Sequence, residues 1–174
     1  PLVGYKVPVE FSKQKIVMHP YLLGYWLFNQ AEDIDCLTIK QAPVLNKIEK
    51  LFRLMYKDLY LCYLDNQDYK IVGRDDFTYK DNLFLKHLKY YKLLENYYIP
   101  HQFRCNTKKY QQELLAGIID SCGVLNKGCY EVVSTNKRLI KDLIYVSRSL
   151  GYAAYLIEVD INKGFDTILD SYLI

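Results

Sequence analysis

Two apolar segments of the chain end in side chains that could take part in chemistry. The first, "YLLGYWLFNQ", carries Asn29 near its end, and the second, "LLAGIIDSCG", carries Cys122. Neither side chain matches Mg²⁺, which prefers carboxylate and water oxygens, because asparagine offers a neutral oxygen and cysteine a soft sulfur. Acids stand close by in the sequence. The candidates for metal-dependent chemistry are Glu32 and Asp33 after the first segment and Asp120 in the second.

Each apolar segment alone predicts a buried core helix, but the two segments share a spacing. Gly24 and Gly117 each lie 12 positions before a cysteine, Cys36 and Cys129 respectively. A glycine removes a side chain, so that a second helix can approach the backbone closely. The matched spacing indicates two copies of one unit, whose helices meet at Gly24 and Gly117.

Similar elements follow each apolar helix. After the first we expect a strand at 35–41, an amphipathic helix at 42–56 and a hairpin at 59–73 that turns near Asn66. A bridging helix should end at the Ile99–Pro100 step, because the residue before proline avoids helical geometry.

The second copy should begin with a helix at 108–122. A turn from Gly123 to Gly128 leads to a strand at 128–135, and a helix then begins near Asn136 and closes at Gly151. A last strand is expected at 152–159.

These paired segments resemble the two motifs of the LAGLIDADG homing endonucleases, specifically those of the intein-encoded branch. Residues 115–123 follow the nine-residue motif closely, and residues 22–30 are similar to its first copy. Flanking segments such as "NYYIPHQFRCN" also match, so the resemblance covers about residues 2–157. It implies an α+β fold of two pseudo-symmetric αββα-type halves. These halves pack through the motif helices and carry saddle-like antiparallel sheets that ride on duplex DNA.

Four positions depart from the family pattern. In the family, the eighth motif residue is an acid that binds a catalytic metal, and this position falls on Asn29 and Cys122. Gln30 replaces the closing glycine of the first motif, and Tyr97 stands where many relatives carry a lysine that faces transition-state charge. The resemblance therefore implies a nuclease fold that has lost its catalytic groups.

Relocated acids are the alternative. Asp120 lies two residues before Cys122, about 200° around the helix, so it cannot point in the same direction as Cys122. A loop could bring Glu32 or Asp33 inward, which would repair the first half alone.

Charge permits a DNA partner without requiring one. The 174 residues include 23 basic and 20 acidic side chains, for a net charge of +3. Lysines in or beside the expected saddle strands are the candidate phosphate contacts: Lys40, Lys70, Lys127 and Lys137. Because many duplex-binding proteins are more basic, a structural protein that uses the fold for protein partners stays open.

The cysteines and the apolar runs narrow the cellular setting. Five cysteines without a CxxC pair indicate an intracellular, reducing compartment, nuclear or cytoplasmic, and give no metal site. No run reaches the roughly 18 apolar residues of a membrane span. Because the chain opens on Pro1, we expect it to be a segment of a longer translation product.

Together these observations predict an N-terminal half at 1–75, a bridging helical segment at 76–106 and a C-terminal half at 107–174, whose tail from 158 has no assigned element. We expect a monomer that binds double-stranded DNA, does not cleave it and needs no cofactor. An active endonuclease that uses relocated acids would instead require Mg²⁺.

Overall fold

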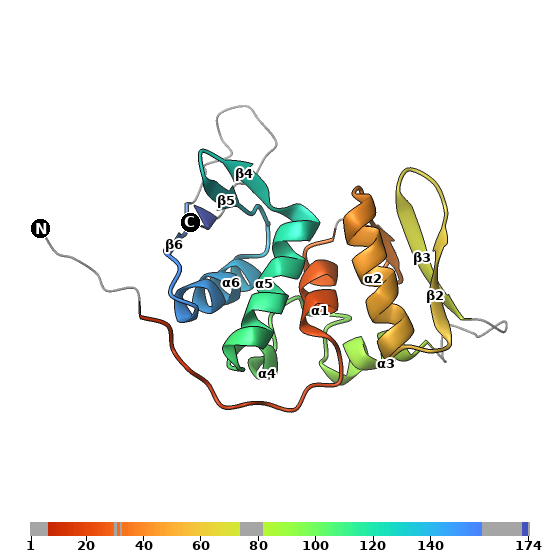
Figure 1. The fold of residues 1–174 in the computed structure, drawn as a ribbon, viewed down its shortest axis with the longest axis horizontal. Helices are drawn as coiled ribbons and strands as arrows, with labels where there is room; N and C mark the ends of the chain where they lie inside the picture. Colours follow the sequence, from red (N-terminus) through yellow and green to blue (C-terminus); the bar gives the residue numbers. More distant parts are fainter. Residues whose placement is uncertain (1–6, 30, 32, 74–81, 158–171, 174) are drawn as a thin grey trace, which may run out of the picture.

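Two helices that are far apart in the sequence, α1 (Pro20–Leu27) and α5 (Lys108–Cys122), lie side by side at the centre of the molecule. The computed structural model describes residues 7–29, 31, 33–73, 82–157 and 172–173. An antiparallel sheet lies to either side of the helix pair (Figure 1). This mixture of helices and antiparallel sheets confirms the α+β expectation.

The first sheet has the strand order β1-β3-β2, from β1 (Cys36–Thr38), β2 (Leu59–Tyr63) and β3 (Asp68–Gly73). Helix α2 (Ala42–Met55) packs beside β2 through Val44, Ile48 and Phe52, whose i, i+4 spacing forms one buried stripe. The β2–β3 hairpin turns through Asn66 and Gln67, both with positive φ. The turn therefore lies where the sequence predicts it.

The bridging segment departs from the expectation of one helix ending at Ile99–Pro100. Helix α3 (Leu83–Tyr90) already ends at Tyr90, and α4 (His101–Arg104) follows Pro100. Lys92 has a φ of 57°, and the N–H of Leu93 donates to the carbonyl of Leu88. These features form a Schellman cap, in which the buried Leu93 side chain favours a turn that lysine would not favour by itself.

The second sheet has the order β4-β5-β7-β6, from β4 (Val124–Asn126), β5 (Cys129–Glu131), β6 (Ala154–Tyr155) and β7 (Tyr172–Leu173). The expected turn from Gly123 to Gly128 is wrong, because half of it forms β4. The turn is confined to Lys127 and Gly128, with φ of 49° and 84°. Two residues with positive φ match the twist of a tight hairpin.

Helix α6 (Lys137–Ser149) begins and ends where the sequence predicts. The Asn136 side chain accepts the N–H groups of Arg138 and Leu139. Gly151, with a φ of 87°, closes the helix, and the N–H of Tyr152 donates to Ser147. Both ends therefore use residues whose local conformations favour helix capping.

The α1–α5 crossing brings two helix backbones into contact. All eight residues of α1 are buried. A Cβ atom added at Gly24 would lie 2.2 Å from the carbonyl oxygen of Leu114, and one added at Gly117 would lie 2.2 Å from that of Tyr21. Because each glycine faces the backbone of the opposite helix, no larger residue fits at this separation.

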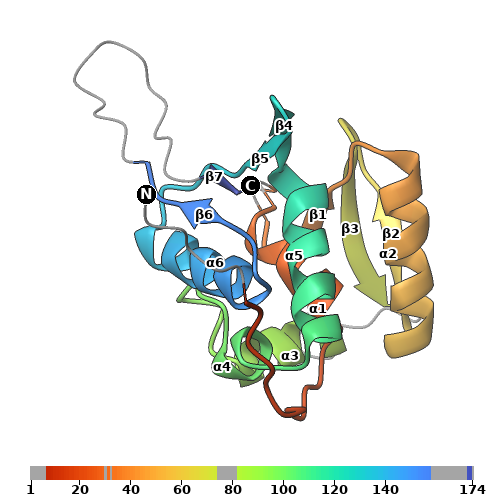
Figure 2. The ribbon, with the colours of Figure 1, turned by 60° about the vertical axis from the view of Figure 1, so that its left-hand side comes forward.

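The N-terminal segment, residues 9–14, lies against the second half of the molecule rather than the first. The N–H of Val9 donates to the carbonyl of Ser149 at 2.7 Å, and the Phe11 ring packs near Tyr145. The Asn106 side chain bonds both the N–H and the carbonyl of Gln14. Figure 2 shows this dark red segment beside α6.

No helix among the described residues has the length and apolar character needed to cross a bilayer.

Candidate nucleic-acid interface

Asn29, just beyond the end of α1, bonds the backbone of β1. Its side-chain oxygen accepts the N–H groups of Thr38 at 3.0 Å and Ala31 at 3.2 Å, and its amide nitrogen donates to the Thr38 carbonyl at 3.0 Å. The backbone N–H and carbonyl of Thr38 face away from β3, because the backbone bonds between β1 and β3 are made at Ile39 and Asp35. The Asn29 amide therefore occupies the place that a neighbouring strand would take.

Tyr25 supports the same contact from one helical turn earlier. Its hydroxyl donates to the Thr38 carbonyl at 2.8 Å. Burial, with the nearby Asp120 and Cys122, raises the pKa of this phenol well above its usual value. The hydroxyl therefore remains a donor at physiological pH, and Thr38 is held by two side chains of the first motif.

Asn29, Asp33 and Tyr97 come together around one small cavity of about 80 Å³. Tyr97, half exposed, stacks on Trp26 with ring centroids 5.4 Å apart. The Trp26 indole nitrogen donates to the carbonyl of Ile34. The cavity is lined by Trp26, Asn29, Ala31, Asp33, Ile34, Cys36 and Tyr97.

Cys122 and Asp120 point to different partners at the end of α5. The Cys122 thiol contacts the carbonyl of Ile118 at 3.6 Å within its own helix. Burial raises the pKa of this thiol to about 12, so it is protonated at neutral pH. Asp120 instead accepts the Tyr21 hydroxyl at 2.6 Å, across the helix crossing. Asp120 thus bonds a side chain of α1 while Cys122 bonds the backbone of α5.

The two motif positions do not fit a divalent cation. The Asn29 oxygen already accepts two backbone N–H groups, and the Cys122 thiol is neutral and soft. Neither position supplies the negative charge that Mg²⁺ or Mn²⁺ takes from carboxylates. No catalytic step through a metal follows from this pair of residues.

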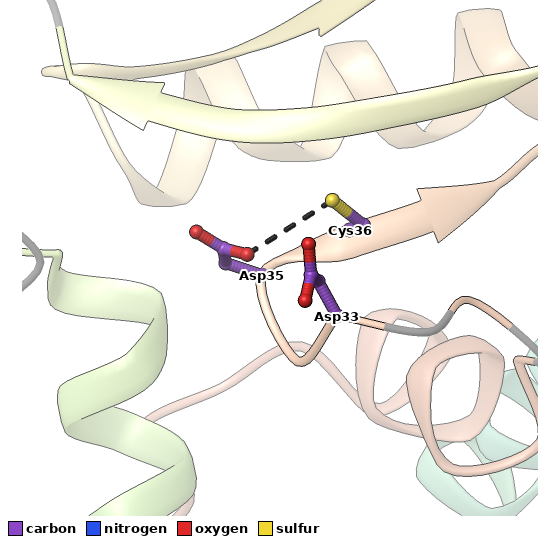
Figure 3. Close-up of side chains that lie close together, drawn as sticks. All are labelled: Asp33, Asp35 and Cys36. Atoms are coloured by element: carbon purple, nitrogen blue, oxygen red, sulfur yellow. Dashed lines mark hydrogen bonds between the residues drawn. The ribbon is translucent and has the colours of Figure 1, made fainter. Parts of the chain in front are cut away.

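Acidic groups do gather after the first motif, as Figure 3 shows. Ligand atoms of Asp33, Asp35 and Cys36 lie within 4.8 Å of one another. The Cys36 thiol is held protonated, because burial and the two carboxylates raise its pKa. Asp35 also pairs with Lys70 at 3.8 Å. Glu32 and Gln30 lie outside the described residues.

The four candidate phosphate contacts lie on separate elements. Lys40 follows β1 and is exposed, and Lys127 is exposed in the β4–β5 turn. Lys70, on β3, shares its charge with Asp35. Lys137 begins α6 and has an interaction partner. Two of the four are therefore already engaged within the protein.

Comparison with solved structures identifies the architecture. The homing endonuclease I-DmoI, in complex with DNA and Mn, matches with a TM-score of 0.60 and 13% identity over 91% of this chain and 89% of that chain. Mesophilic variants from I-DmoI match with a TM-score of 0.60 and 11% identity, over 91% and 88% of the two chains. The chain has the LAGLIDADG homing endonuclease fold. No protein-family model matches the sequence, and no curated protein matches it.

Within the homing endonuclease fold, sequence reasoning missed Tyr25, Trp26 and Thr38 as parts of the site. Tyr25 and Asn29 are spaced i, i+4, which places them on one side of a helix and could have linked them. Thr38 carried no such signal, because only the sheet register shows that its backbone groups face away from β3.

Proposed function

We propose that this protein is a duplex DNA-binding module of homing-endonuclease descent that does not cleave its target. The fold supports DNA binding, since I-DmoI has been crystallised with its target DNA in the same architecture. The observation that carries the loss of cleavage is the bonding of Asn29. The Asn29 amide nitrogen and oxygen both bond the backbone of Thr38, in the place of a neighbouring strand. This side chain therefore has a structural role and offers no charged ligand to a metal ion.

A similar element order in the two halves, which differ by one strand before the second helix, supports descent from a two-motif enzyme. Helix α1 is followed by β1, α2, β2 and β3, while α5 is followed by β4, β5, α6, β6 and β7. The intein-encoded branch is the proposed source, on the evidence of the flanking sequence segments. All five cysteines are unpaired, which agrees with the reducing, intracellular setting proposed here.

Selection from randomised duplexes tests both parts of the proposal. The protein is incubated with the duplex pool in EDTA, Mg²⁺ or Mn²⁺, and bound and cut molecules are sequenced separately. We expect an enriched bound sequence in all three conditions and no cut molecules. Absence of duplex binding at low salt would contradict the proposal and favour a role with protein partners.

Restoring the acids gives a second test that needs no DNA target. The double variant Asn29→Asp/Cys122→Asp places two carboxylates around Tyr25, which shares the Thr38 carbonyl with Asn29 and whose pKa is raised in part by Cys122. Their repulsion should lower stability in EDTA. Added Mg²⁺ should then raise its melting temperature, because a ligand that binds the folded state stabilises it. The unmodified protein should melt at the same temperature in EDTA and in Mg²⁺.

A metal-dependent nuclease is the second candidate function, because Asp33 lines the same cavity as Asn29 and Tyr97. Asp35 lies beside it and could share a cation. Under this alternative, the unmodified protein nicks duplex DNA with Mg²⁺ or Mn²⁺. The variant Asp33→Asn should then abolish nicking, while Asp120→Asn, whose carboxylate bonds Tyr21, should leave nicking in place.

A further inference from the structure

The edge strands of the two sheets differ in whether side chains bond their outward backbone groups. Asn29 and Tyr25 bond the outward groups of Thr38 on β1. On β6, the Arg148 side chain donates twice to the carbonyl of Ala154, at 2.6 and 2.9 Å. Side chains thus satisfy backbone groups at these two edges, which limits pairing with another chain.

Strand β2 forms the other edge of the first sheet and is open. The N–H of Leu64 donates to the carbonyl of Asp68. In the register of the two strands, every second residue counted back from Leu64, namely Cys62 and Tyr60, therefore directs its N–H toward β3. Because bonded and non-bonded pairs alternate, Leu61 and Tyr63 direct their N–H groups away from β3. Among the described residues, no group accepts a hydrogen bond from the N–H of Leu61 or of Tyr63.

The side chains of β2 also favour pairing. Residues 59–64, "LYLCYL", form an uncharged run of residues common in strands, without proline or glycine. Tyr60 is 46% exposed and Tyr63 is 59% exposed. A groove of about 730 Å³ runs between α2 and β2, lined by Glu49, Phe52, Arg53, Lys57, Leu59, Tyr60 and Leu61.

We propose that a second copy of this chain pairs antiparallel with β2 across a two-fold axis at Leu61. This register satisfies the outward N–H of Leu61 with the Leu61 carbonyl of the other copy, and places each Tyr63 opposite Leu59 in the groove. It also brings Lys57 of each copy, in the turn before β2, toward Asp65 of the other, in the bend after β2, and both residues are exposed. Charge complementarity at both ends selects this register over a shift of two residues.

The pairing joins two three-stranded sheets into one of six strands. It replaces the monomer expected from the sequence with a two-fold dimer, an arrangement common among soluble oligomers. The inference does not depend on DNA binding, so its test can succeed or fail separately from the proposed function.

The first experiment measures sedimentation of the full chain over a range of concentrations without DNA. We expect a reversible monomer–dimer equilibrium for the unmodified protein. The variant Leu61→Pro removes an N–H that β3 does not use, and proline is tolerated at that position of an edge strand. This variant should stay monomeric with its circular dichroism spectrum unchanged. An unmodified protein that is monomeric at its highest soluble concentration would overturn the proposal.

Charge reversal tests the register and does not depend on proline being tolerated. Lys57→Asp alone, or Asp65→Lys alone, turns two attractions into two repulsions and should weaken the dimer by about fivefold to tenfold. The double variant Lys57→Asp/Asp65→Lys exchanges the charges and should restore dimerisation to within about twofold. Failure of the double variant to recover the dimer would refute this pairing.

Discussion

At the scale of single residues, Asn29 shows how one side chain can satisfy the outward backbone groups of an edge strand. An amide carries both a donor and an acceptor, as a peptide group does, whereas a carboxylate carries acceptors alone. The three bonds to Thr38 and Ala31 use both kinds of atom. The Asn29 side chain therefore takes the place of a neighbouring strand beside β1.

We predict that Asn29→Ala lowers the free energy of unfolding by about 1 to 3 kcal/mol, because it leaves the Thr38 N–H without its partner at a sheet edge. The change is measured by urea unfolding. Asn126→Ala is the matched control, since Asn126 makes one exposed bond to Glu131 and should cost less than about 0.5 kcal/mol. Equal losses for the two variants would contradict the role given to Asn29.

Cys122 gives a prediction for pH. Burial holds the pKa of the folded thiol at about 12, above its ordinary value in the unfolded chain. Stability from this group is complete below pH 8 and falls as pH rises, because the unfolded chain releases the proton first. The free energy of unfolding of the unmodified protein should fall by about 1.5 to 2 kcal/mol more than that of Cys122→Ala between pH 8 and pH 10. Parallel falls in the two proteins would contradict the raised pKa.

Residue types alone predicted the chemistry of this site in part. That Asn29 and Cys122 cannot serve Mg²⁺ follows from their side-chain atoms. The bonding of Asn29 to Thr38 does not, because it depends on which groups of β1 face away from β3. Similarly, the stacking of Tyr97 on Trp26 joins residues from distant parts of the chain.

At the scale of elements, the helix crossing is the tightest contact and the most sensitive to change. We predict that Gly24→Ala and Gly117→Ala each destabilise the protein by about 1 to 3 kcal/mol or more, because the added carbon meets backbone atoms that cannot rotate away. Chemical denaturation measures the loss. Gly128→Ala is the control: open space surrounds that residue, so its cost is limited to about 1 kcal/mol of backbone strain at positive φ.

Elements with strong local signals were predictable, and the others show what local signals miss. Helix α6 carries both an asparagine cap and a closing glycine, and its limits match the prediction. Helix α3 ends at Tyr90 through a cap whose left-handed residue is Lys92, for which the sequence gives no sign. The cap is favoured by burial of Leu93, which belongs to tertiary packing.

At the scale of the whole molecule, a carboxylate of the protein competes with DNA phosphates for one lysine of the proposed DNA surface. Lys70 is paired with Asp35, so part of its charge is unavailable to phosphates. We predict that Asp35→Asn raises duplex affinity at low salt and steepens the salt dependence by up to about 0.9 in logarithmic slope, as one released phosphate contact requires. Fluorescence anisotropy over a salt series measures both effects.

Glu113→Gln serves as the control for that measurement. Glu113 also pairs with a lysine, Lys47, but on the helices rather than on a sheet. The substitution Glu113→Gln changes the net charge by the same amount as Asp35→Asn, so a general effect of net charge on DNA affinity would appear in both variants. An equal gain in affinity from the two changes would place the DNA contact elsewhere.

The N-terminal segment has a consequence for the order in which the protein forms during synthesis. Residues 9–14 leave the ribosome well before their partners, because Val9 bonds Ser149 and Phe11 lies near Tyr145. Helix α1 likewise has its buried surface completed by α5. The apolar residues of α1 must therefore wait without their partner helix until α5 has emerged as far as Cys122. During that interval we expect the exposed apolar residues to make the nascent chain a substrate for chaperones, and its release from them to depend on the arrival of α5.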